Sequence, residues 1–314
     1  MVNLEKILVT GGAGFIGSHL VDAYLSQGFQ VVVVDNLSTG RVENVNPQAR
    51  FYPVDITSFA DLATVFKKEQ PDYLNHHAAQ INLRRSVEEP VFDGRINILG
   101  SLNLLELSRQ FGIKKFIFAS TGGAIYGEVD NLPVGEDTPA LPLSPYGVAK
   151  RSVELYLNYY HQIWGLDYVA LRYGNVYGPR QDPTGEAGVI AIFCGRILKN
   201  QPCLVFGQGN KTRDYVFVED VAQANLLALQ AACGIYNIGT GKETSVLDLI
   251  GLFRKASGKK EIPVQFEPEK KGEINRIALS SRLAREKLNW SPQTPLTEGL
   301  TKTYKWFAQK EKGK

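Results

Sequence analysis

Thr10-Gly11-Gly12-Ala13-Gly14-Phe15-Ile16-Gly17 is the stretch that decides the fold of this chain. It joins the apolar run Leu4–Thr10 to Phe15–Ser26, where apolar residues recur at helical spacing, and the valine run Val31–Val34 follows. Glycines between a strand and a helix permit a tight turn and let backbone N–H groups approach a pyrophosphate. Asp35 then follows at the end of the valine run. An acid at that place completes the pattern of a dinucleotide-binding site.

The identity of the acid also bears on the choice of dinucleotide. A carboxylate at Asp35 accepts hydrogen bonds from a ribose 2′-OH and repels a 2′-phosphate, which favours NAD over NADP. Arg41 is near enough in the sequence to have the opposite effect, although a solvated surface charge is its simpler interpretation. We therefore expect NAD as the cofactor.

The alternation of strand and helix continues over roughly 170 residues, which is typical of a doubly wound parallel sheet. Four consecutive valines leave no polar face, as expected for a strand covered by helices on both sides. Further strands are predicted at Arg50–Val54, Tyr73–His76, Lys115–Ser120, Tyr168–Arg172, Cys203–Phe206 and Gly234–Ile238, and helices at Asn97–Phe111, Val148–Gly165, Val189–Lys199 and Val221–Ala231. The sequence thus predicts an α/β fold, a doubly wound parallel Rossmann sheet with a smaller C-terminal α/β substrate-binding lobe.

Glycine and proline become denser from Gly174 onward, and Ile262–Gly272 is rich in proline and lysine without a clear period. These segments are expected to leave the sheet and to cover the substrate. We therefore assign residues 1–173 and about 214–257 to the NAD-binding domain, and about 174–213 and 258–314 to the lobe.

Composition narrows the class of partner. The 314 residues are 44% apolar and 21% charged, which excludes a disordered chain. Lys and Arg number 35 against 32 Asp and Glu, so the balance of +3 does not indicate nucleic-acid or membrane binding. The sequence contains no apolar run of about 18 residues and no signal-peptide pattern at its start, so a cytoplasmic protein with a small-molecule substrate is expected.

Cys194, Cys203 and Cys233 are odd in number and lack metal-type spacing. The sequence therefore indicates neither a disulfide framework nor a zinc site, and no metal is predicted. We expect the three cysteines to be small buried apolar residues.

The second chemical signal is a tyrosine and a lysine four residues apart, Tyr146 and Lys150, which share one face of a helix. Chance alone predicts roughly one such pair in this composition, so position decides its meaning. The pair opens a helix after Ser144, and the preceding strand ends in Ser120-Thr121, at the sheet edge where ligands of such folds bind. An ammonium group and a cationic nicotinamide both favour a phenolate, so Tyr146 is a candidate base for a substrate hydroxyl.

The sequence matches a known family in a series of stretches that occur in the same order along the chain. These stretches are Thr10–Gly17, Asp35-Asn36, Val54–Ile56, His76–Gln80, Asn97, Ser120–Gly127, Ser144–Lys150, Leu171–Arg180, Arg213–Tyr215 and Tyr236–Gly241. In these the sequence resembles the extended short-chain dehydrogenases/reductases. Within that superfamily it is similar to the NAD-dependent UDP-glucose 4-epimerases over essentially the whole chain.

The resemblance implies the site. It places Tyr146, Lys150 and Thr121 in catalysis, and a homodimer through the helices around Asn97–Phe111 and Val148–Gly165. The implied cofactor residues are Gly11, Gly14, Phe15, Ile16, Gly17, Asp35, Asn36, Ser38, Thr39, Gly40, Asp55, Ile56, His77, Ala78, Ala79, Gln80, Asn97, Ser120, Tyr146, Lys150 and Tyr173. The implied residues for a UDP-sugar are Thr121, Gly122, Tyr146, Asn175, Val189, Phe206, Arg213, Lys270, Glu273 and Ile277.

The chain departs from the family pattern at Gly122 and at Lys270 with Glu273, and Ile277 bears on the size of the sugar. Gly122 stands where many epimerases have a Ser or Thr that binds the reacting hydroxyl, so Thr121, Ser120 or a water takes that role. Lys270 and Glu273 keep the charges of the usual Arg and Asp, but a lysine cannot make a bidentate phosphate contact. Ile277, a medium aliphatic residue at the position that limits the sugar pocket, suggests room for an N-acetylated sugar.

The resemblance implies 4-epimerisation of a UDP-hexose through a transient 4-keto sugar. A UDP-uronic acid 4-epimerase or decarboxylase stays open, because Arg84, Arg85 or Arg180 could hold a carboxylate. A 4,6-dehydratase is disfavoured, since Gly122-Gly123 follow Thr121 where that family has Asp-Glu. A non-catalytic NAD-sensing module is disfavoured by the intact Tyr146 and Lys150.

Overall fold

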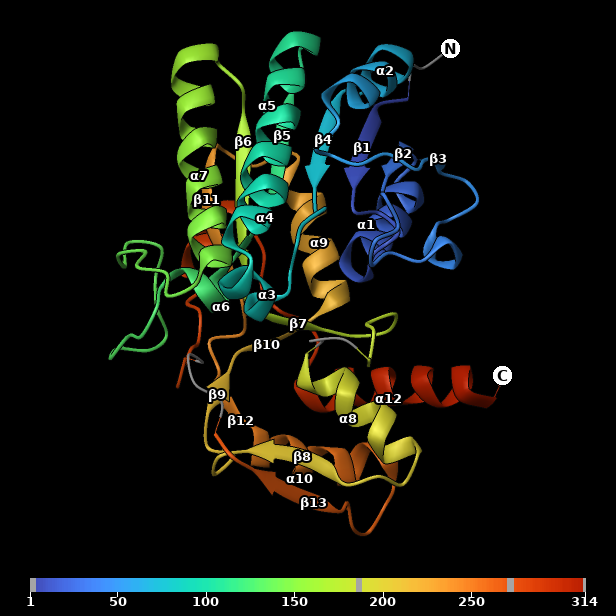
Figure 1. The fold of residues 1–314 in the computed structure, drawn as a ribbon, viewed down its shortest axis with the longest axis vertical. Coiled ribbons are helices and arrows are strands. Elements are labelled where there is room, and N and C mark those ends of the chain that lie inside the picture. The colour runs from blue at the N-terminus through green and yellow to red at the C-terminus, as the bar shows by residue number, and fades with distance from the viewer. Residues whose placement is uncertain (1–3, 185–187, 270–273, 313–314) are drawn as a thin grey trace.

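A central sheet of seven parallel strands forms the larger half of the molecule in the computed structural model, which describes residues 4–184, 188–269 and 274–312 (Figure 1). The strands lie in the order β11-β6-β5-β4-β1-β2-β3. Their bounds are β1 (Lys6–Thr10), β2 (Gln30–Val34), β3 (Arg50–Tyr52), β4 (Tyr73–His76), β5 (Lys115–Thr121), β6 (Tyr168–Tyr173) and β11 (Gly234–Ile238). The predicted doubly wound parallel sheet is thereby confirmed.

Both faces of the sheet are covered, as the valine run predicted. Val32 and Val34 pack in one apolar cluster, whereas Val31 and Val33 pack in another on the opposite face. Alternate side chains of a strand point to opposite faces, so a strand buried on both sides needs apolar residues at every position.

Helices from distant parts of the chain cover each face. One face is covered by α1 (Phe15–Ser26), α9 (Val218–Ala228) and α11 (Arg282–Leu288), and the other by α2 (Phe59–Glu69), α5 (Gly100–Phe111) and α7 (Pro145–Trp164). Shorter elements lie between them: η1 (Val42–Asn44), α3 (Leu83–Glu88), α4 (Pro90–Gly94), the π-helical turn η2 (Arg95–Leu99) and α6 (Gly122–Ile125).

In the smaller lobe, in the lower half of Figure 1, the described residues form three two-stranded sheets and three helices around an apolar cluster of their own. The strand pairs are β7 (Asn175–Tyr177) with β10 (Tyr215–Phe217), β8 (Cys203–Phe206) with β13 (Val264–Glu267), and β9 (Thr212–Arg213) with β12 (Thr244–Ser245). The helices are α8 (Val189–Leu198), α10 (Val246–Ser257) and α12 (Leu296–Lys312).

The division of the chain expected from the sequence differs from the packing at two strands and two helices. Strands β10 and β12, assigned to the NAD-binding domain, pair with β7 and β9 of the lobe. Helix α10, assigned to the NAD-binding domain, packs with Phe253 in the apolar cluster of the lobe. Helix α11, assigned to the lobe, packs with Ala284 and Leu288 against the sheet, and Trp290, which follows the helix, joins the same cluster. Both helices are amphipathic, so the sequence shows that each buries a face but not which core receives it.

Helix α7 begins three residues earlier than expected, at Pro145, because Ser144 caps it. The Ser144 hydroxyl oxygen accepts a hydrogen bond from the Gly147 backbone N–H at 3.2 Å, and proline is well suited to the first helical turn. This start places Tyr146 and Lys150 in the first two turns of the helix.

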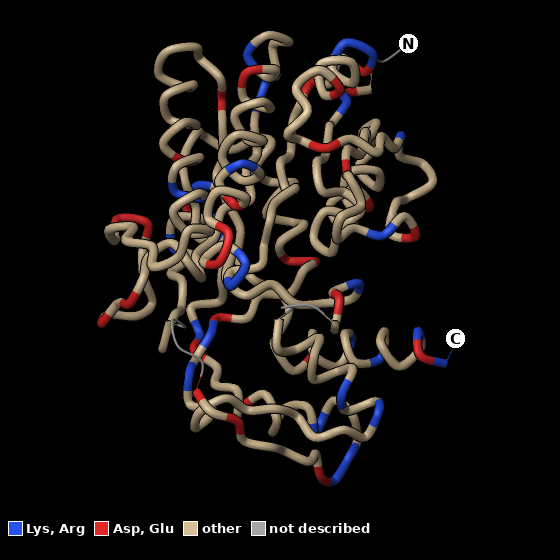
Figure 2. The backbone as a smooth tube through the Cα atoms, in the orientation of Figure 1, with Lys and Arg blue, Asp and Glu red and all other residues tan. Residues whose placement is uncertain are grey.

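Charged residues are distributed over both halves of the molecule, with Lys and Arg interspersed among Asp and Glu (Figure 2). None of the helices within the described ranges is both long and apolar enough to cross a membrane.

Candidate active site

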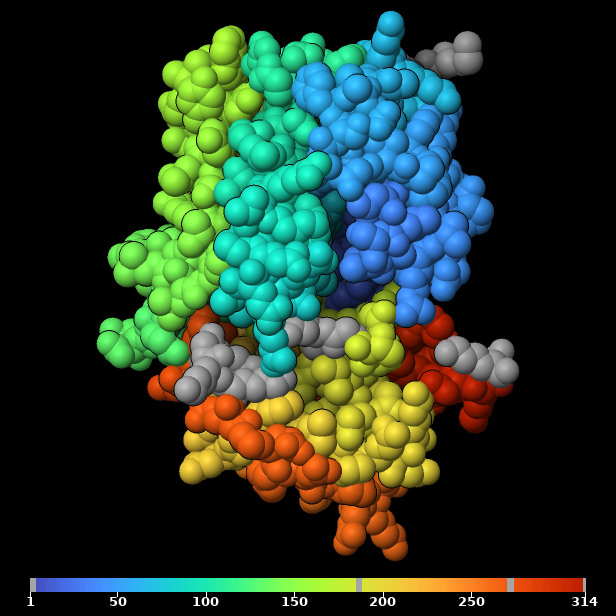
Figure 3. Space-filling view, in the orientation of Figure 1, coloured from blue at the N-terminus to red at the C-terminus, as the bar shows by residue number. Residues whose placement is uncertain are grey.

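The predicted cofactor residues lie at one edge of the central sheet. All neighbouring strands pair in parallel, so their carboxyl ends meet there, and the arrowheads of β1 and β4 point toward the lobe in Figure 1. Figure 3 shows a hollow between the segments coloured cyan and blue, with dark blue atoms of the N-terminal region at its floor. Four groups of these residues each follow a strand: Gly11, Gly14, Phe15, Ile16 and Gly17 after β1; Asp35, Asn36, Ser38, Thr39 and Gly40 after β2; Asp55 and Ile56 after β3; and His77, Ala78, Ala79 and Gln80 after β4. Ser120 and Tyr173 lie in the last residues of β5 and β6.

The glycine loop is closed so tightly that side chains cannot replace its hydrogens. Gly11 has φ +71°, and a Cβ there would lie 2.6 Å from the backbone nitrogen of Ala78. A Cβ at Gly17 would lie 2.1 Å from the carbonyl oxygen of Gly11. The N-terminus of α1 therefore lies directly against the loop, and its backbone N–H groups suit a pyrophosphate.

Asp35 is buried at the end of β2 and held by backbone groups. Its carboxylate accepts hydrogen bonds from the N–H groups of Ala13 at 3.0 Å and Leu37 at 2.8 Å. Burial raises the pKa of Asp35, and these two hydrogen bonds oppose the rise. Arg41, which left the choice of cofactor open, forms an ion pair with Asp182 at 2.8 Å. The fixed carboxylate is consistent with a ribose hydroxyl and not with a 2′-phosphate.

The loop after β4 is fixed by an amide on the π-helical turn. Asn97 Oδ1 accepts from the Gln80 N–H, and Asn97 Nδ2 donates to the Gln80 carbonyl and to Asp93 Oδ1, each at 2.9 Å. The other oxygen of Asp93 is buried and has no hydrogen bond within the described chain. The wider π-helical turn at Asn97 is the kind of irregularity often found at functional sites.

His77 and Tyr173 form a stacked pair at the same edge. Their rings are inclined at 25°, and His77 Nε2 lies 3.0 Å from the Tyr173 hydroxyl. Burial, reinforced by the charge of Lys150, lowers the pKa of His77 to about 3, so the ring is neutral at pH 7. Its Nδ1 is buried and unpaired within the described residues. The glycine loop, the fixed carboxylate of Asp35 and the unpaired Nδ1 of His77 together fit NAD. The predicted cofactor residues at this edge of the sheet would hold it.

Tyr146 and Lys150 lie beside the end of β5. Lys150 Nζ donates to the Ala119 carbonyl at 2.9 Å and lies 5.8 Å from the centroid of the Tyr146 ring. Burial lowers the pKa of Lys150 to about 8, against the opposing charges of Asp93 and Glu154. Burial and the charge of Asp93 raise the pKa of Tyr146. A nearby cation is therefore needed for the phenol to act as a base.

The hydroxyl groups at the end of β5 differ in availability. Ser120 donates to Glu154 at 2.7 Å, and Arg172 binds the same carboxylate at 2.7 and 2.8 Å. The half-buried Thr121 side chain makes no hydrogen bond with any described residue. Ser120 and Thr121 are the two hydroxyl residues that the sequence offers for binding the reacting hydroxyl of a substrate. Of these, Thr121 has the available hydroxyl group.

The comparison with protein families decides the class of this site. The model of the NAD-dependent epimerase/dehydratase family matches residues 7–239. The chain belongs to this family.

Members of the family with closely similar structures are known. A UDP-glucose 4-epimerase from Thermotoga maritima, solved with UDP-glucose, is 49% identical over 98% of this chain and 99% of that chain, with a TM-score of 0.95. The Thermus thermophilus UDP-glucose 4-epimerase complex with NAD is 45% identical over 96% and 98% of the two chains, with a TM-score of 0.92. A UDP-glucose 4-epimerase of Mycolicibacterium smegmatis is 43% identical over 97% of this chain and 99% of its own.

The predicted substrate residues of this family member come from scattered elements. Asn175 opens β7, Arg213 lies in β9, Val189 begins α8 and Phe206 ends β8. Arg213 Nη1 donates to the carbonyl oxygens of Thr212 at 2.8 Å and Asn275 at 3.4 Å.

A surface salt bridge with Asp214 or Glu219 is the simple alternative for Arg213 that the neighbouring acids of the sequence suggest. Arg213 makes no ion pair with any acid of the described residues, so this alternative is wrong. Asp214, its expected partner, instead accepts hydrogen bonds from the backbone of Thr240, Gly241 and Leu279. Glu219, the other expected partner, lies 3.8 Å from Lys302. The guanidinium of Arg213 thus keeps its capacity for a phosphate.

Ile277 is buried in a small apolar cluster with Ile125, Tyr126, Val134 and Leu279. Only 1% of its surface is exposed, so its control of the sugar pocket stays a prediction. Lys270 and Glu273 lie outside the described residues.

Two residues of the site had no signal that identified them beforehand. Asp93 precedes Asn97 by four residues, a helical spacing that would have paired them, but carboxylates are common at such spacing. Leu279 fills the space above Gly122, where a Cβ would lie 2.3 Å from Leu279 Cδ1. The glycine at 122 is explained by this distant leucine, which no local pattern indicates.

Proposed function

We propose that the chain is an NAD-dependent 4-epimerase of UDP-hexoses that interconverts UDP-glucose and UDP-galactose. The observation that carries this proposal is the placement of Tyr146, Lys150 and an available Thr121 hydroxyl at the sheet edge that also holds the glycine loop and Asp35. The relatives at 43–49% identity named UDP-glucose 4-epimerase support the choice of reaction.

NAD, when bound, supplies the acceptor and donor of a hydride at the sugar C4. Tyr146 takes the proton of the 4-hydroxyl as the C4 hydride leaves, so that the C–O bond becomes a carbonyl. Lys150 stabilises the phenolate by its charge, and Thr121 donates a hydrogen bond to the reacting oxygen. Tyr146 then returns the proton to that oxygen when hydride adds to the opposite face of C4.

The change of face requires the keto sugar to turn while its diphosphate stays bound. Arg213 and Asn175 are the groups we assign to the diphosphate, since a guanidinium offers a planar fork to phosphate oxygens. Phe206 and the backbone near Val189 are assigned to the uracil. These residues lie on lobe elements, apart from the catalytic pair on α7.

We infer a homodimer in which α7 lies at the interface. Leu155, Tyr159 and Ile163 are exposed at intervals of four residues, which places them on one face of α7. Leu99, on the neighbouring π-helical turn, is 55% exposed. An apolar stripe of this kind is typical of an interface between subunits.

The uronic acid alternative is less favoured by the arginines proposed for it. Arg85 pairs with Glu89 at 3.2 Å and lies 3.8 Å from the centroid of the Phe92 ring, while Arg180 pairs with Asp22 at 2.7 Å. Arg85 is therefore engaged by other side chains, and Arg180 is engaged through Nη2, whereas its buried Nη1 has no hydrogen-bond partner among the described residues.

The test is to incubate the purified protein separately with UDP-glucose, UDP-N-acetylglucosamine and UDP-glucuronate, without added reductant, and to identify the nucleotide sugars formed. Conversion of UDP-glucose to UDP-galactose is the expected result. Turnover of UDP-N-acetylglucosamine would support the inference from Ile277 that the sugar pocket has room for an N-acetylated sugar. A reaction of the uronate alone, or of none of the three, would overturn the substrate assignment.

Tyr146→Phe removes the proposed base, and we expect kcat to fall about 1,000-fold because general-base catalysis contributes on that scale. Bound NAD should be unchanged in this variant. Tyr156→Phe, on the exposed surface of the same helix, is the matched control and should keep full activity. Retention of most activity in Tyr146→Phe would contradict the proposed role.

A further inference from the structure

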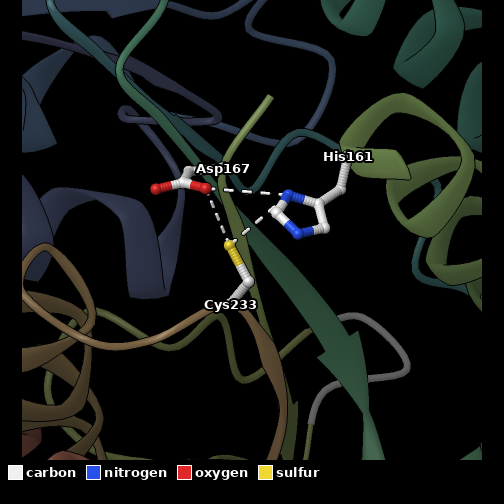
Figure 4. Close-up of side chains that lie close together, drawn as sticks. All are labelled: His161, Asp167 and Cys233. Atoms are coloured by element: carbon white, nitrogen blue, oxygen red, sulfur yellow. Dashed lines mark hydrogen bonds and ion pairs between the residues drawn. The ribbon is translucent and has the colours of Figure 1, made fainter. Parts of the chain in front are cut away.

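His161, Asp167 and Cys233 meet at the edge of the sheet opposite the active site (Figure 4). Cys233 Sγ lies 3.0 Å from Asp167 Oδ1 and 3.7 Å from His161 Nδ1, and His161 Nδ1 lies 3.6 Å from Asp167 Oδ1. Cys233 is partly exposed, unlike the two other cysteines, so the expectation that all three would be buried is wrong for this one.

The parallel sheet brings these residues together. Asp167 immediately precedes β6 and Cys233 immediately precedes β11, and these neighbouring strands run parallel, so both residues lie at their amino ends. His161 lies in the last turn of α7, the helix that leads into β6. The three residues span more than 70 positions, which is why sequence spacing gave no metal signal.

The three donor atoms have the separations of ligands around a tetrahedral zinc ion. Zinc binds thiolate sulfur at about 2.3 Å and imidazole nitrogen or carboxylate oxygen at about 2.0 Å, which puts neighbouring ligand atoms about 3.3–3.6 Å apart. The observed separations of 3.0, 3.6 and 3.7 Å bracket this range. Thiolate, imidazole and carboxylate are also the ligand set that zinc prefers over magnesium or calcium.

We propose that His161, Asp167 and Cys233 bind a zinc ion through one atom each, with water as the fourth ligand. Asp167 is exposed and His161 is partly exposed, so water reaches the cluster. The site would tie the end of α7 to the starts of β6 and β11.

Without metal the cluster is held by hydrogen bonds. The Cys233 thiol donates to Asp167, and His161 Nδ1 lies 3.3 Å from the Leu166 carbonyl oxygen. Zinc binding needs the imidazole proton on Nε2, which leaves the Nδ1 lone pair for the ion, and it replaces the thiol proton. One Zn²⁺ therefore enters and one proton leaves, with no change of oxidation state.

The first experiment measures zinc binding to the whole protein after treatment with a chelator. We expect one zinc per chain by equilibrium dialysis and elemental analysis, and no binding of magnesium. At free zinc about 100 times the dissociation constant, the melting temperature should rise by roughly 5 °C. Epimerase activity on UDP-glucose should be the same with and without zinc, which separates this site from the proposed function.

The second experiment uses three single variants: Cys233→Ser, His161→Gln and Asp167→Asn. Each keeps a polar side chain of similar size, and each should weaken zinc binding at least tenfold and so reduce the thermal shift at the same free zinc to about half or less. Asp130→Asn, at an exposed aspartate outside the cluster, is the matched control and should bind zinc as the parent does. Failure of one variant to fold leaves the other two to decide. Unchanged zinc stoichiometry in the variants, or absence of zinc binding in the parent, would overturn the proposal.

Discussion

The two halves of the molecule supply their expected site residues in different ways. On the sheet side, the expected NAD residues sit in short loops that each follow a strand, and backbone atoms set their positions, as at Gly11 and Gly17. On the lobe side, the expected UDP residues come from separate short strands and helices, as with Asn175, Phe206 and Arg213. The first side is fixed by the geometry of one sheet, whereas the second depends on several small elements packing together.

This difference predicts which property a substitution in each half should change. On the sheet side a single added methyl group meets backbone that cannot move, so the fold and the cofactor should be lost together. On the lobe side a changed side chain alters one contact with the substrate, so affinity should change while the fold and the cofactor remain.

Gly17→Ala should give the largest effect on stability. The new Cβ would lie 2.1 Å from the Gly11 carbonyl oxygen, and overpacking against backbone costs about 3 kcal/mol. We expect a matching fall in the free energy of unfolding, measured by denaturant titration, and loss of bound NAD.

Gly251→Ala is the control for this variant. Gly251 lies within α10 of the lobe, and a Cβ there meets nothing within 4 Å. The alanine should stabilise the protein by roughly 0.5–1 kcal/mol because it favours helix. Equal destabilisation by both variants would remove the contrast between the two sides.

His77 should make the sheet side sensitive to acid. Burial lowers its pKa to about 3 in the folded protein, from 6.5 in the unfolded chain. The folded state thus binds fewer protons between these values, so the stability is complete above pH 6.5 and is lost as the pH falls toward 3. Between pH 7 and 5 this one group should account for a loss of about 2 kcal/mol.

Denaturant titrations of the parent and of His77→Gln at pH 7 and pH 5 check this expectation. The glutamine can still donate to the Tyr173 hydroxyl, and it does not titrate. His76 and His19, whose pKa values are also lowered by burial, are present in both proteins and cancel in the comparison. The same loss between the two pH values in both proteins would rule out His77 as the source.

Arg213→Lys should give the smallest of the three effects and should act only on the substrate. A lysine keeps the charge but loses the planar fork, so we expect KM for UDP-glucose to rise about tenfold with little change in kcat. Bound NAD should be unchanged. Arg276→Lys, at an exposed arginine paired with Glu243, is the control and should leave KM as it is. A fall in kcat with constant KM would point to a role other than binding the diphosphate.

Local patterns explain which parts were predictable. The glycine loop, Asp35 and the Tyr146–Lys150 pair each lie within one strand–turn–helix unit, where spacing follows directly from backbone geometry. The strands β4, β8 and β11 begin and end where the sequence placed them. Their apolar composition and flanking turns are sufficient to define such short elements.

The remaining features depend on contacts between distant residues. Gly122 is explained by Leu279, and α10 joins the lobe because of what its apolar face meets. The turn η2 is π-helical within a segment that the periodicity predicted as ordinary helix from Asn97 onward. A hydrophobic pattern shows that a residue is buried, but the partner is decided by tertiary packing.

The path of the chain between its two halves has one more consequence. The polypeptide passes from β6 into β7 of the lobe, returns at α9, leaves again after β11 and returns once more to α11 before ending in α12. The halves are therefore threaded through each other rather than joined by a single linker. We expect a protease that cuts one surface loop to leave a nicked protein whose fragments stay together, and a gene cut after residue 173 to yield neither half in folded form.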